Sequence, residues 1–552
     1  MKRALMLLLA LAAAVPSRTA APYSVDVHEW MTERALPDSA WLRQGGPNDL
    51  TLQDLDAFRQ WLWGRASTLT DVAVRTRFLA RFPTVERFTA RAFRELLAFN
   101  GNSGTASRVE GIDALPAGAP RTPRDLLRVG SSAPDRDGRN RNRFAVDAAS
   151  GQPQKDTEGR FVPADPATLN LGKPEGLSSQ AHAHYGLLEE GLSDDVDVLK
   201  SNPERFAIRA GFADGPVLSL AADMMELHSS LALLSLLWGG HGARALAVSF
   251  VGQGFHYLQD VGNQIHTVQV GLYEFFRDAK LQYWWRALIT AGGYLAPLQS
   301  FSSVGVDILS NHHLLIEQLG RARLKEAQAG GAKSAAFQAA VDALGSDDAA
   351  FASRLDQALQ APRARGEVGR PITRALIAAS APEGPELYRA MRDLGCGRLR
   401  LYGFKLPEAE NELKDPDALV CGAADADGAR RLEELYALEG RGFARVATAM
   451  RRTDRELAAV AADPDREALT NDLLTRFVRE RLDLLDAGEA RRAAYLAALP
   501  PASFGPTRDV AWLIGELVVL LALAVFVWRR SQGGSSKLQP SPSSCGDQRS
   551  DT

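Results

Sequence analysis

Three side chains in the middle of the chain have the types and the spacing of a metal site. His256 and Asp260 are four residues apart, so on a helix they lie on one face, one turn above the other. Gly262 and Asn263 favour a break after this turn, which allows His266 to turn back toward the same point. Imidazoles and carboxylates are ligands that zinc prefers in proteins. The spacing therefore predicts a metal centre, whereas a His-x-x-x-Asp pair by itself is also common as a surface hydrogen bond.

The distribution of histidine supports a metal centre over a surface pair. All nine histidines lie between residues 28 and 313, and none follows in the long remainder of the chain. The further candidate ligands in this zone are His28, His182, His184, the helically spaced pair His313 and Glu317, and His312 as an alternative to His313. Two other histidines, His228 and His241, are predicted to be structural or surface residues.

Composition narrows the class of protein. A chain of 552 residues is long enough for two or more domains with hydrophobic cores. The formal net charge of −3, without a dominant basic patch, argues against a dedicated nucleic-acid partner. Three cysteines are too few for a disulfide scaffold or a cysteine zinc site. Cys396 and Cys421 can pair in an oxidising compartment, or both can remain thiols.

The N-terminus, residues 1–21, has the composition of a secretory signal peptide. Two basic residues open the chain, an apolar stretch too short to span a bilayer comfortably follows, and small residues lead to Ala21. Cleavage near Ala21 leaves a mature chain that begins a few residues before His28. The alternative is an uncleaved anchor.

A second apolar run, residues 510–528, has the length of a transmembrane helix. Trp512 and Trp528 stand near its ends, and only Glu516 interrupts it. Two arginines follow at once, which predicts a cytoplasmic tail at 529–552, and the composition of this tail predicts disorder. The two ends predict a single-pass protein of the cell membrane with its main domain outside the cytoplasm. A buried soluble helix is the alternative for the run.

Helical spacing of apolar residues dominates the rest of the chain and predicts an all-α fold. We expect one or two helices over 205–238, a Gly-rich turn at 239–242, a central apolar helix over 243–260 and a further helix over 308–329. Residues 101–176 are rich in Gly, Pro, Asp, Asn and Arg, which predicts a long loop region that carries ligands.

The composition of the sequence changes after residue 330, where Ala, Arg, Asp and Glu alternate. We therefore divide the exported part into a catalytic domain at 22–330 and a helical accessory region at 331–505. The accessory region is either a stalk or packing for the catalytic domain. No feature predicts an oligomeric state.

The motif residues together resemble the bacterial zinc-dependent phospholipase C family, which is similar in fold to the fungal single-strand nucleases that use three zinc ions. The run HYLQD, from His256 to Asp260, with a histidine six residues later, carries the resemblance most specifically. The segment HEWMTERA at His28 is similar to the first-helix motif of the family, and His313 and Glu317 resemble its last ligand pair. The segment NRFAVD, which ends at Asp147, looks like its Asp-bearing segment. The resemblance covers roughly residues 25–320.

The resemblance implies a multi-helix domain with three zinc positions. The ligands of the first would be Asp147, His182 or His184, His256 and Asp260. The ligands of the second would be His266, His313 and Glu317. The ligands of the third would be His28, Asp260 as a bridge, and the free N-terminal amine and carbonyl of the mature chain. Asp147 would also serve catalysis by accepting a proton from the attacking water.

The expected activity is that of a zinc-dependent phosphoric diester hydrolase that cleaves a glycerophospholipid into diacylglycerol and a phosphorylated head group. The similar nucleases typically carry an Asp-Arg-Gly-Gly-Asn type run after the equivalent of His266, whereas TVQVG follows here, which favours a phospholipase. One alternative is a nuclease or another phosphoesterase on the same scaffold. The other is a non-enzymatic, metal-stabilised envelope protein.

Overall fold

The structure, a computed structural model, describes residues 25–36, 39, 52–89, 92–93, 122–137, 186, 221–267, 316, 319–326, 329, 335–360, 366–391 and 426–498. Every regular element in these residues is helical, which confirms the all-α prediction. Within these residues, no helix has the length and apolar character needed to cross a membrane. The predicted signal peptide, the apolar run at 510–528 and the tail at 529–552 lie outside the described residues.

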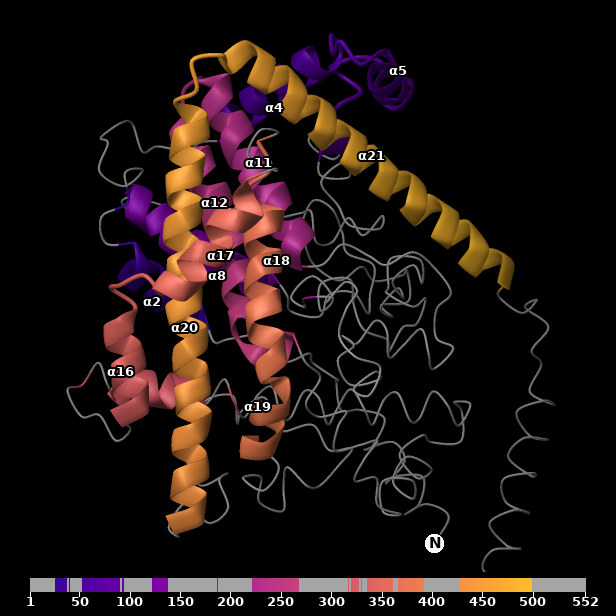
Figure 1. The fold of residues 1–552 in the computed structure, drawn as a ribbon. Coiled ribbons are helices and arrows are strands. Elements are labelled where there is room, and N and C mark those ends of the chain that lie inside the picture. The colour runs from indigo at the N-terminus through magenta and orange to yellow at the C-terminus, as the bar shows by residue number, and fades with distance from the viewer. Residues whose placement is uncertain are drawn as a thin grey trace, which may run out of the picture.

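A hairpin of two apolar helices forms the centre of the fold (Figure 1). Helix α11 (Ala221–Trp238) and helix α12 (Ala243–Gly262) are buried along most of their length, because they are apolar on nearly all sides. The predicted turn between them is confirmed. Gly239 and Gly242 have φ values of 66° and 75° there, a backbone conformation that favours glycine.

Helices from both ends of the described chain surround this hairpin. On or near α12 pack α2 (Val25–Ala35), α4 (Leu52–Ala66), α8 (Pro123–Asp137), α18 (Gly369–Ser380) and α20 (Ala426–Ala461). The remaining elements are α5 (Val72–Arg81), the short helix η6 (Gln264–His266), α16 (Ala335–Ala343), α17 (Ala349–Leu359), η8 (Ala381–Glu383), α19 (Gly384–Met391) and α21 (Arg466–Ala498). Helix α20 runs along the bundle, and α21 slopes away from its upper end across α4 and α5 (Figure 1).

Helix α8 corrects the prediction that 101–176 is loop throughout. The hydroxyl of Thr122 accepts a hydrogen bond from the backbone N–H of Asp125 at 3.1 Å, and the Asp125 carboxylate accepts one from the N–H of Thr122 at 3.3 Å. This reciprocal pair, with proline at the first helical position, is a helix start signal. Leu126 and Leu127 are buried and contribute to the core that α8 forms with α12. The region therefore contains a helix because its local capping signal and apolar face outweigh its loop-like composition.

Two glycines let α8 and α12 cross backbone against backbone. A Cβ on Gly252 would lie 2.6 Å from the carbonyl oxygen of Leu127, and one on Gly130 would lie 2.9 Å from the carbonyl oxygen of Ser249. Such distances leave no room for a side chain, so only glycine permits this approach. The crossing places the backbone of α8 next to the second half of α12.

A charged network joins the C-terminal helices to the central hairpin. The Arg370 guanidinium of α18 pairs with Asp223 of α11 at 2.9 Å and with Glu480 of α21 at 2.9 Å. Glu226 of α11 accepts a hydrogen bond from the backbone N–H of Arg370 at 3.0 Å and pairs with Arg476 of α21 at 2.7 Å. The buried apolar residues of the described helices after residue 330 also belong to the same hydrophobic core as those of α11 and α12.

Candidate metal centre

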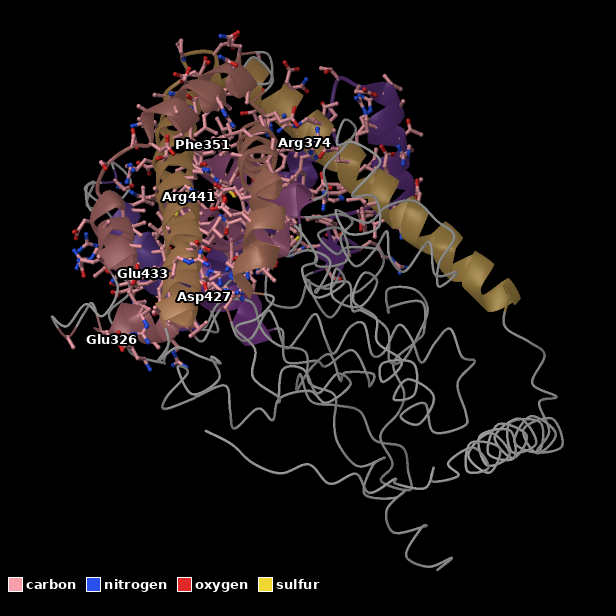
Figure 2. The ribbon with its side chains drawn as sticks, turned by 60° about the horizontal axis from the view of Figure 1, so that its bottom comes forward. Glu326, Phe351, Arg374, Asp427, Glu433 and Arg441 are labelled. Atoms are coloured by element: carbon pink, nitrogen blue, oxygen red, sulfur yellow. The ribbon has the colours of Figure 1, made fainter. Side chains whose placement is uncertain are left out.

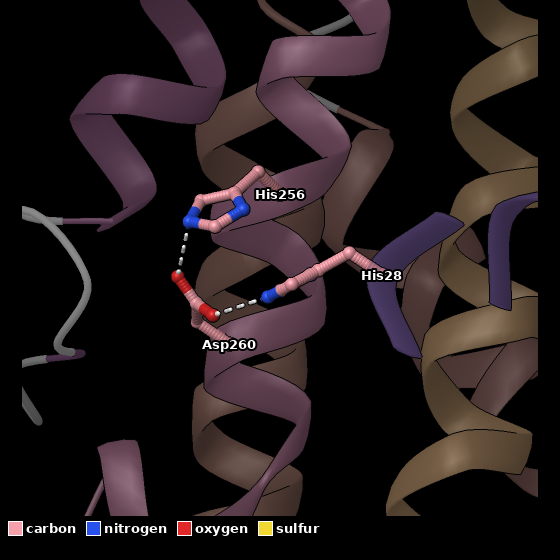
Figure 3. A group of neighbouring side chains, drawn as sticks. All are labelled: His28, His256 and Asp260. Atoms are coloured by element: carbon pink, nitrogen blue, oxygen red, sulfur yellow. Dashed lines mark ion pairs between the residues drawn. The ribbon is translucent and has the colours of Figure 1, made fainter. Parts of the chain in front are cut away.

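His28, His256 and Asp260 come together in the interior of the bundle (Figure 3). His256 and Asp260 project from α12, and His28 reaches toward them from α2. All three side chains are completely buried. One possible ligand atom from each residue lies within 4.8 Å of those of the other two. We refer to these three residues as the His–His–Asp cluster.

The spacing within the His–His–Asp cluster fits ligands around an ion. Nε2 of His256 lies 3.3 Å from Oδ2 of Asp260, and Nε2 of His28 lies 3.6 Å from Oδ1. Two atoms that each bind one tetrahedral zinc ion at about 2.1 Å stand about 3.4 Å apart. A charged hydrogen bond between imidazolium and carboxylate would be shorter, at about 2.8 Å. The observed distances are therefore closer to those of two ligands than to those of a short ion pair.

The carboxylate of Asp260 divides its oxygen atoms between the two imidazoles. Oδ1 is the atom nearest to His28, and Oδ2 is the atom nearest to His256. The two imidazole rings lie against each other, with centroids 4.3 Å apart and planes tilted by 32°. A carboxylate in this position is able to bind one ion beside both rings, or to bridge two ions that each take one imidazole.

The orientation of His256 follows from its contact with α8. Its Nδ1 lies 2.9 Å from the backbone carbonyl oxygen of Ser131. A carbonyl oxygen only accepts hydrogen bonds, so Nδ1 carries a proton, and a neutral ring then presents the lone pair of Nε2 to Asp260. A lone pair and a carboxylate that face each other in a dry interior repel, and a cation between them removes this cost.

His266 is buried but does not belong to the His–His–Asp cluster. Helix α12 ends at Gly262, two residues beyond its predicted end and at the predicted break. The side chain of Asn263 then caps the short helix η6 by accepting from the N–H of Ile265 at 3.2 Å. His266 lies at the end of this turn. The expectation from local spacing that His266 meets His256 and Asp260 at one point is therefore wrong, because the group of ligand atoms within 4.8 Å of one another includes His28 of α2 and not His266.

The other predicted ligands, Asp147, His182, His184, His313 and Glu317, lie outside the described residues. The same holds for the predicted cysteine pair, Cys396 and Cys421. The three-zinc arrangement and the catalytic role of Asp147 thus stay predictions.

The turn that carries His266 is held by a charged contact that the sequence did not predict. Nε2 of Gln264 donates to Glu383 at 2.6 Å and to the carbonyl oxygen of Leu438 at 3.0 Å. Burial acts to raise the pKa of Glu383, but hydrogen bonds from Arg445 and Gln264 leave that pKa below its ordinary value. Glu383 also pairs with Arg441, which stands on α20 (Figure 2). No sequence spacing connects Gln264 with Glu383, since only packing brings them together.

The two histidines predicted to be structural or surface residues are not members of the cluster. His228 is buried, its Nδ1 lies 2.9 Å from the carbonyl oxygen of Met224, and burial lowers its pKa to about 4. His241 is largely exposed, and its Nδ1 lies 2.7 Å from Asp54.

Comparison with known proteins gave no match for this chain among protein families, curated proteins or solved structures. The functional interpretation therefore depends on the residues and their geometry.

Proposed function

We propose that this chain is an exported, membrane-anchored, zinc-dependent phosphodiesterase of phospholipase C type that hydrolyses glycerophospholipids. The observation that carries the proposal is the buried His–His–Asp cluster, which two helices far apart in the sequence build together. Burying a carboxylate is costly unless a cation or hydrogen bonds compensate its charge, and two neutral imidazoles beside it supply the remaining ligands of a zinc site. The resemblance of the surrounding motifs to the phospholipase C family supplies the reaction.

The residues proposed to hold zinc begin with the cluster itself. Asp260 would bridge two ions, and His28 and His256 would each bind one of them. The further ligands proposed for a total of three ions are Asp147, His182 or His184, His266, His313 and Glu317. Bound zinc supplies a water of lowered pKa and positive charge for the phosphate oxygens. Asp147 would accept the proton of that water.

The proposed setting is the extracytoplasmic face of the cell membrane. The signal peptide at 1–21 would export the chain, and the apolar run at 510–528 would hold it at a lipid surface, which is also where the substrate lies. No nucleic-acid partner is expected from the near-neutral charge.

Metal content and hydrolysis test the proposal on the full-length protein in detergent micelles. We expect at least two tightly bound zinc ions per chain and release of phosphorylated head group from phosphatidylcholine in mixed micelles. Fewer than two zinc ions per chain would refute the proposal that this chain is a zinc-dependent enzyme. Hydrolysis of single-stranded DNA but not of phospholipid would indicate a nuclease and not a phospholipase. Bound zinc without either activity would indicate that the metal has a structural role.

Replacement of Asp260 by Asn gives the sharpest variant, because it keeps the shape of the side chain and removes the charge. We expect Asp260→Asn to lose metal and activity together. Asp54→Asn is the matched control, since Asp54 is also buried and also contacts a histidine, His241, away from the cluster. Intact metal content in Asp260→Asn would contradict the role proposed for Asp260.

A further inference from the structure

Gln259 stands between the two motif residues of α12 and is completely buried. Its Oε1 lies 2.6 Å from Nδ1 of His28, a residue 231 positions away in the sequence. Its Nε2 lies 2.8 Å from Oγ1 of Thr32, 3.3 Å from the carbonyl oxygen of His28 and 3.6 Å from Sδ of Met450. One amide therefore connects α12 with α2 and α20 beside the His–His–Asp cluster.

The hydrogen bond of Thr32 determines which way this amide faces. The hydroxyl of Thr32 donates to the carbonyl oxygen of His28 at 2.9 Å, so its proton is already used. Its oxygen must then accept from Gln259, which requires the NH2 group on that side. The reverse orientation would place the amide oxygen 3.3 Å from the carbonyl oxygen of His28, where two acceptors would face each other.

The orientation of the amide in turn determines the protonation of His28. Because Oε1 of Gln259 only accepts, Nδ1 of His28 carries a proton, so the Nε2 atom is the one left to present a lone pair toward Oδ1 of Asp260 when the ring is neutral. The hydrogen bonds form a closed ring that leaves His28 at Nδ1, passes through Gln259 and Thr32, and returns to the carbonyl oxygen of His28.

We infer that Gln259 is a positioning residue that holds His28 as an Nε2 ligand of the metal centre. The inference rests on the proposed metal centre and adds a residue that is not itself a ligand. Without the amide acceptor, the ring of His28 is able to protonate Nε2 instead, and a protonated nitrogen cannot bind a metal ion. Loss of such an outer partner typically weakens metal binding about 10–100-fold.

Three variants test this role in the full-length protein in detergent micelles. Gln259→Met has similar length but cannot accept from Nδ1, whereas Gln259→Glu keeps the acceptor. Gln253→Met is the matched control, because Gln253 is a buried glutamine on the same helix that bonds His228 outside the cluster. Zinc affinity is measured by competition with a chelator, and the ligand set is read from the visible absorption of the cobalt-substituted protein.

We expect Gln259→Met to weaken the affinity of one zinc site about 10–100-fold and to change the cobalt spectrum. Gln259→Glu keeps the acceptor for Nδ1 but loses the amide donors to Thr32 and to the carbonyl oxygen of His28, so it should weaken the site less than Gln259→Met. Gln253→Met should leave the affinity and the spectrum unchanged. Thr32→Val, which removes the hydroxyl that orients the amide, should weaken the same site to a smaller extent and covers the case in which Gln259→Met fails to fold. Wild-type affinity and spectrum in Gln259→Met would overturn this inference and leave the proposed function standing. If Gln259→Met does not fold, wild-type affinity and spectrum in Thr32→Val would do the same. A wild-type protein without zinc overturns the proposed function and the inference with it.

Discussion

A buried acid on α20 gives a prediction that the structure makes quantitative. Glu439 is 2% exposed, and neither of its carboxylate oxygens accepts a hydrogen bond from a described residue. Its carboxylate packs against the backbone of Gly320, where a Cβ would lie 3.5 Å from Oε1. Burial raises the pKa of Glu439 to about 8, although the nearby charge of Arg323 acts in the opposite direction. The folded protein therefore holds this group as a neutral acid.

The cost of ionising Glu439 sets the expected size of the effect. Because the folded protein binds the proton more tightly than the unfolded chain, the stabilisation is complete below pH 4.5, the ordinary pKa, and is lost as the pH rises toward 8. At about 1.4 kcal/mol per pKa unit, the free energy of unfolding falls by about 3–4 kcal/mol between pH 5 and pH 8 on account of this group. Gln has the same shape and no charge to bury, so Glu439→Gln should avoid this loss.

Urea unfolding followed by far-ultraviolet circular dichroism measures the difference directly. The stability of Glu439→Gln relative to wild type should increase by about 3–4 kcal/mol from pH 5 to pH 8. Comparing the two proteins at both pH values cancels the contributions of the titratable groups that they share. Glu456→Gln is the control on the same helix, because Glu456 is also buried but pairs with Arg452 at 3.1 Å, so its replacement should not stabilise the protein at pH 8. An equal difference between Glu439→Gln and wild type at both pH values would show that the reasoning about the buried acid is wrong.

Two further predictions concern the central helices. Burial lowers the pKa of His228 from 6.5 to about 4, so the wild type should lose about 3 kcal/mol of stability as the pH falls from 6.5 to 4. The variant His228→Gln should lose about 3 kcal/mol less over the same pH range, measured by acid unfolding. Identical acid unfolding transitions in the two proteins would contradict this prediction. Gly252→Ala places a Cβ 2.6 Å from the carbonyl oxygen of Leu127, so it should destabilise the protein by about 1–3 kcal/mol and lower zinc content by moving α8 away from His256. Gly64→Ala, with nothing within 4 Å of its Cβ, should cost no stability in the same unfolding assay, and equal losses in both variants would rule out the crossing as the cause.

Local sequence signals were sufficient for the parts of the fold that depend on neighbours along the chain. The apolar run of α12, the Gly-rich turn before it and the break after Gly262 were all predicted, because periodicity and glycine act within a few residues. The position of His256 and Asp260 on one face follows from the helical repeat alone. Helix α8 was missed although its capping signal at Thr122 is also local, since the composition of the surrounding region was given more weight.

Which helix completes the candidate site on α12 was decided by tertiary structure. Spacing alone selected His266 as the third group, whereas the structure supplies His28. The resemblance included His28 among the ligands, but the types and spacing of the residues did not show that α2 lies against α12. A helical repeat determines angles within one helix and contains no information about which other helix packs on it.

The sequence by itself determined the residue types of the candidate centre, the face that His256 and Asp260 share on α12, and the all-α class of the fold. Tertiary structure alone decided the hydrogen bonds that orient those residues, such as Nδ1 of His256 on the carbonyl oxygen of Ser131 and Nδ1 of His28 on Gln259. The physical reason is that these contacts join groups more than a hundred positions apart, whose distance is set by how closely the helices pack. At α8 and α12 this packing depends on the absence of a side chain at Gly130 and Gly252.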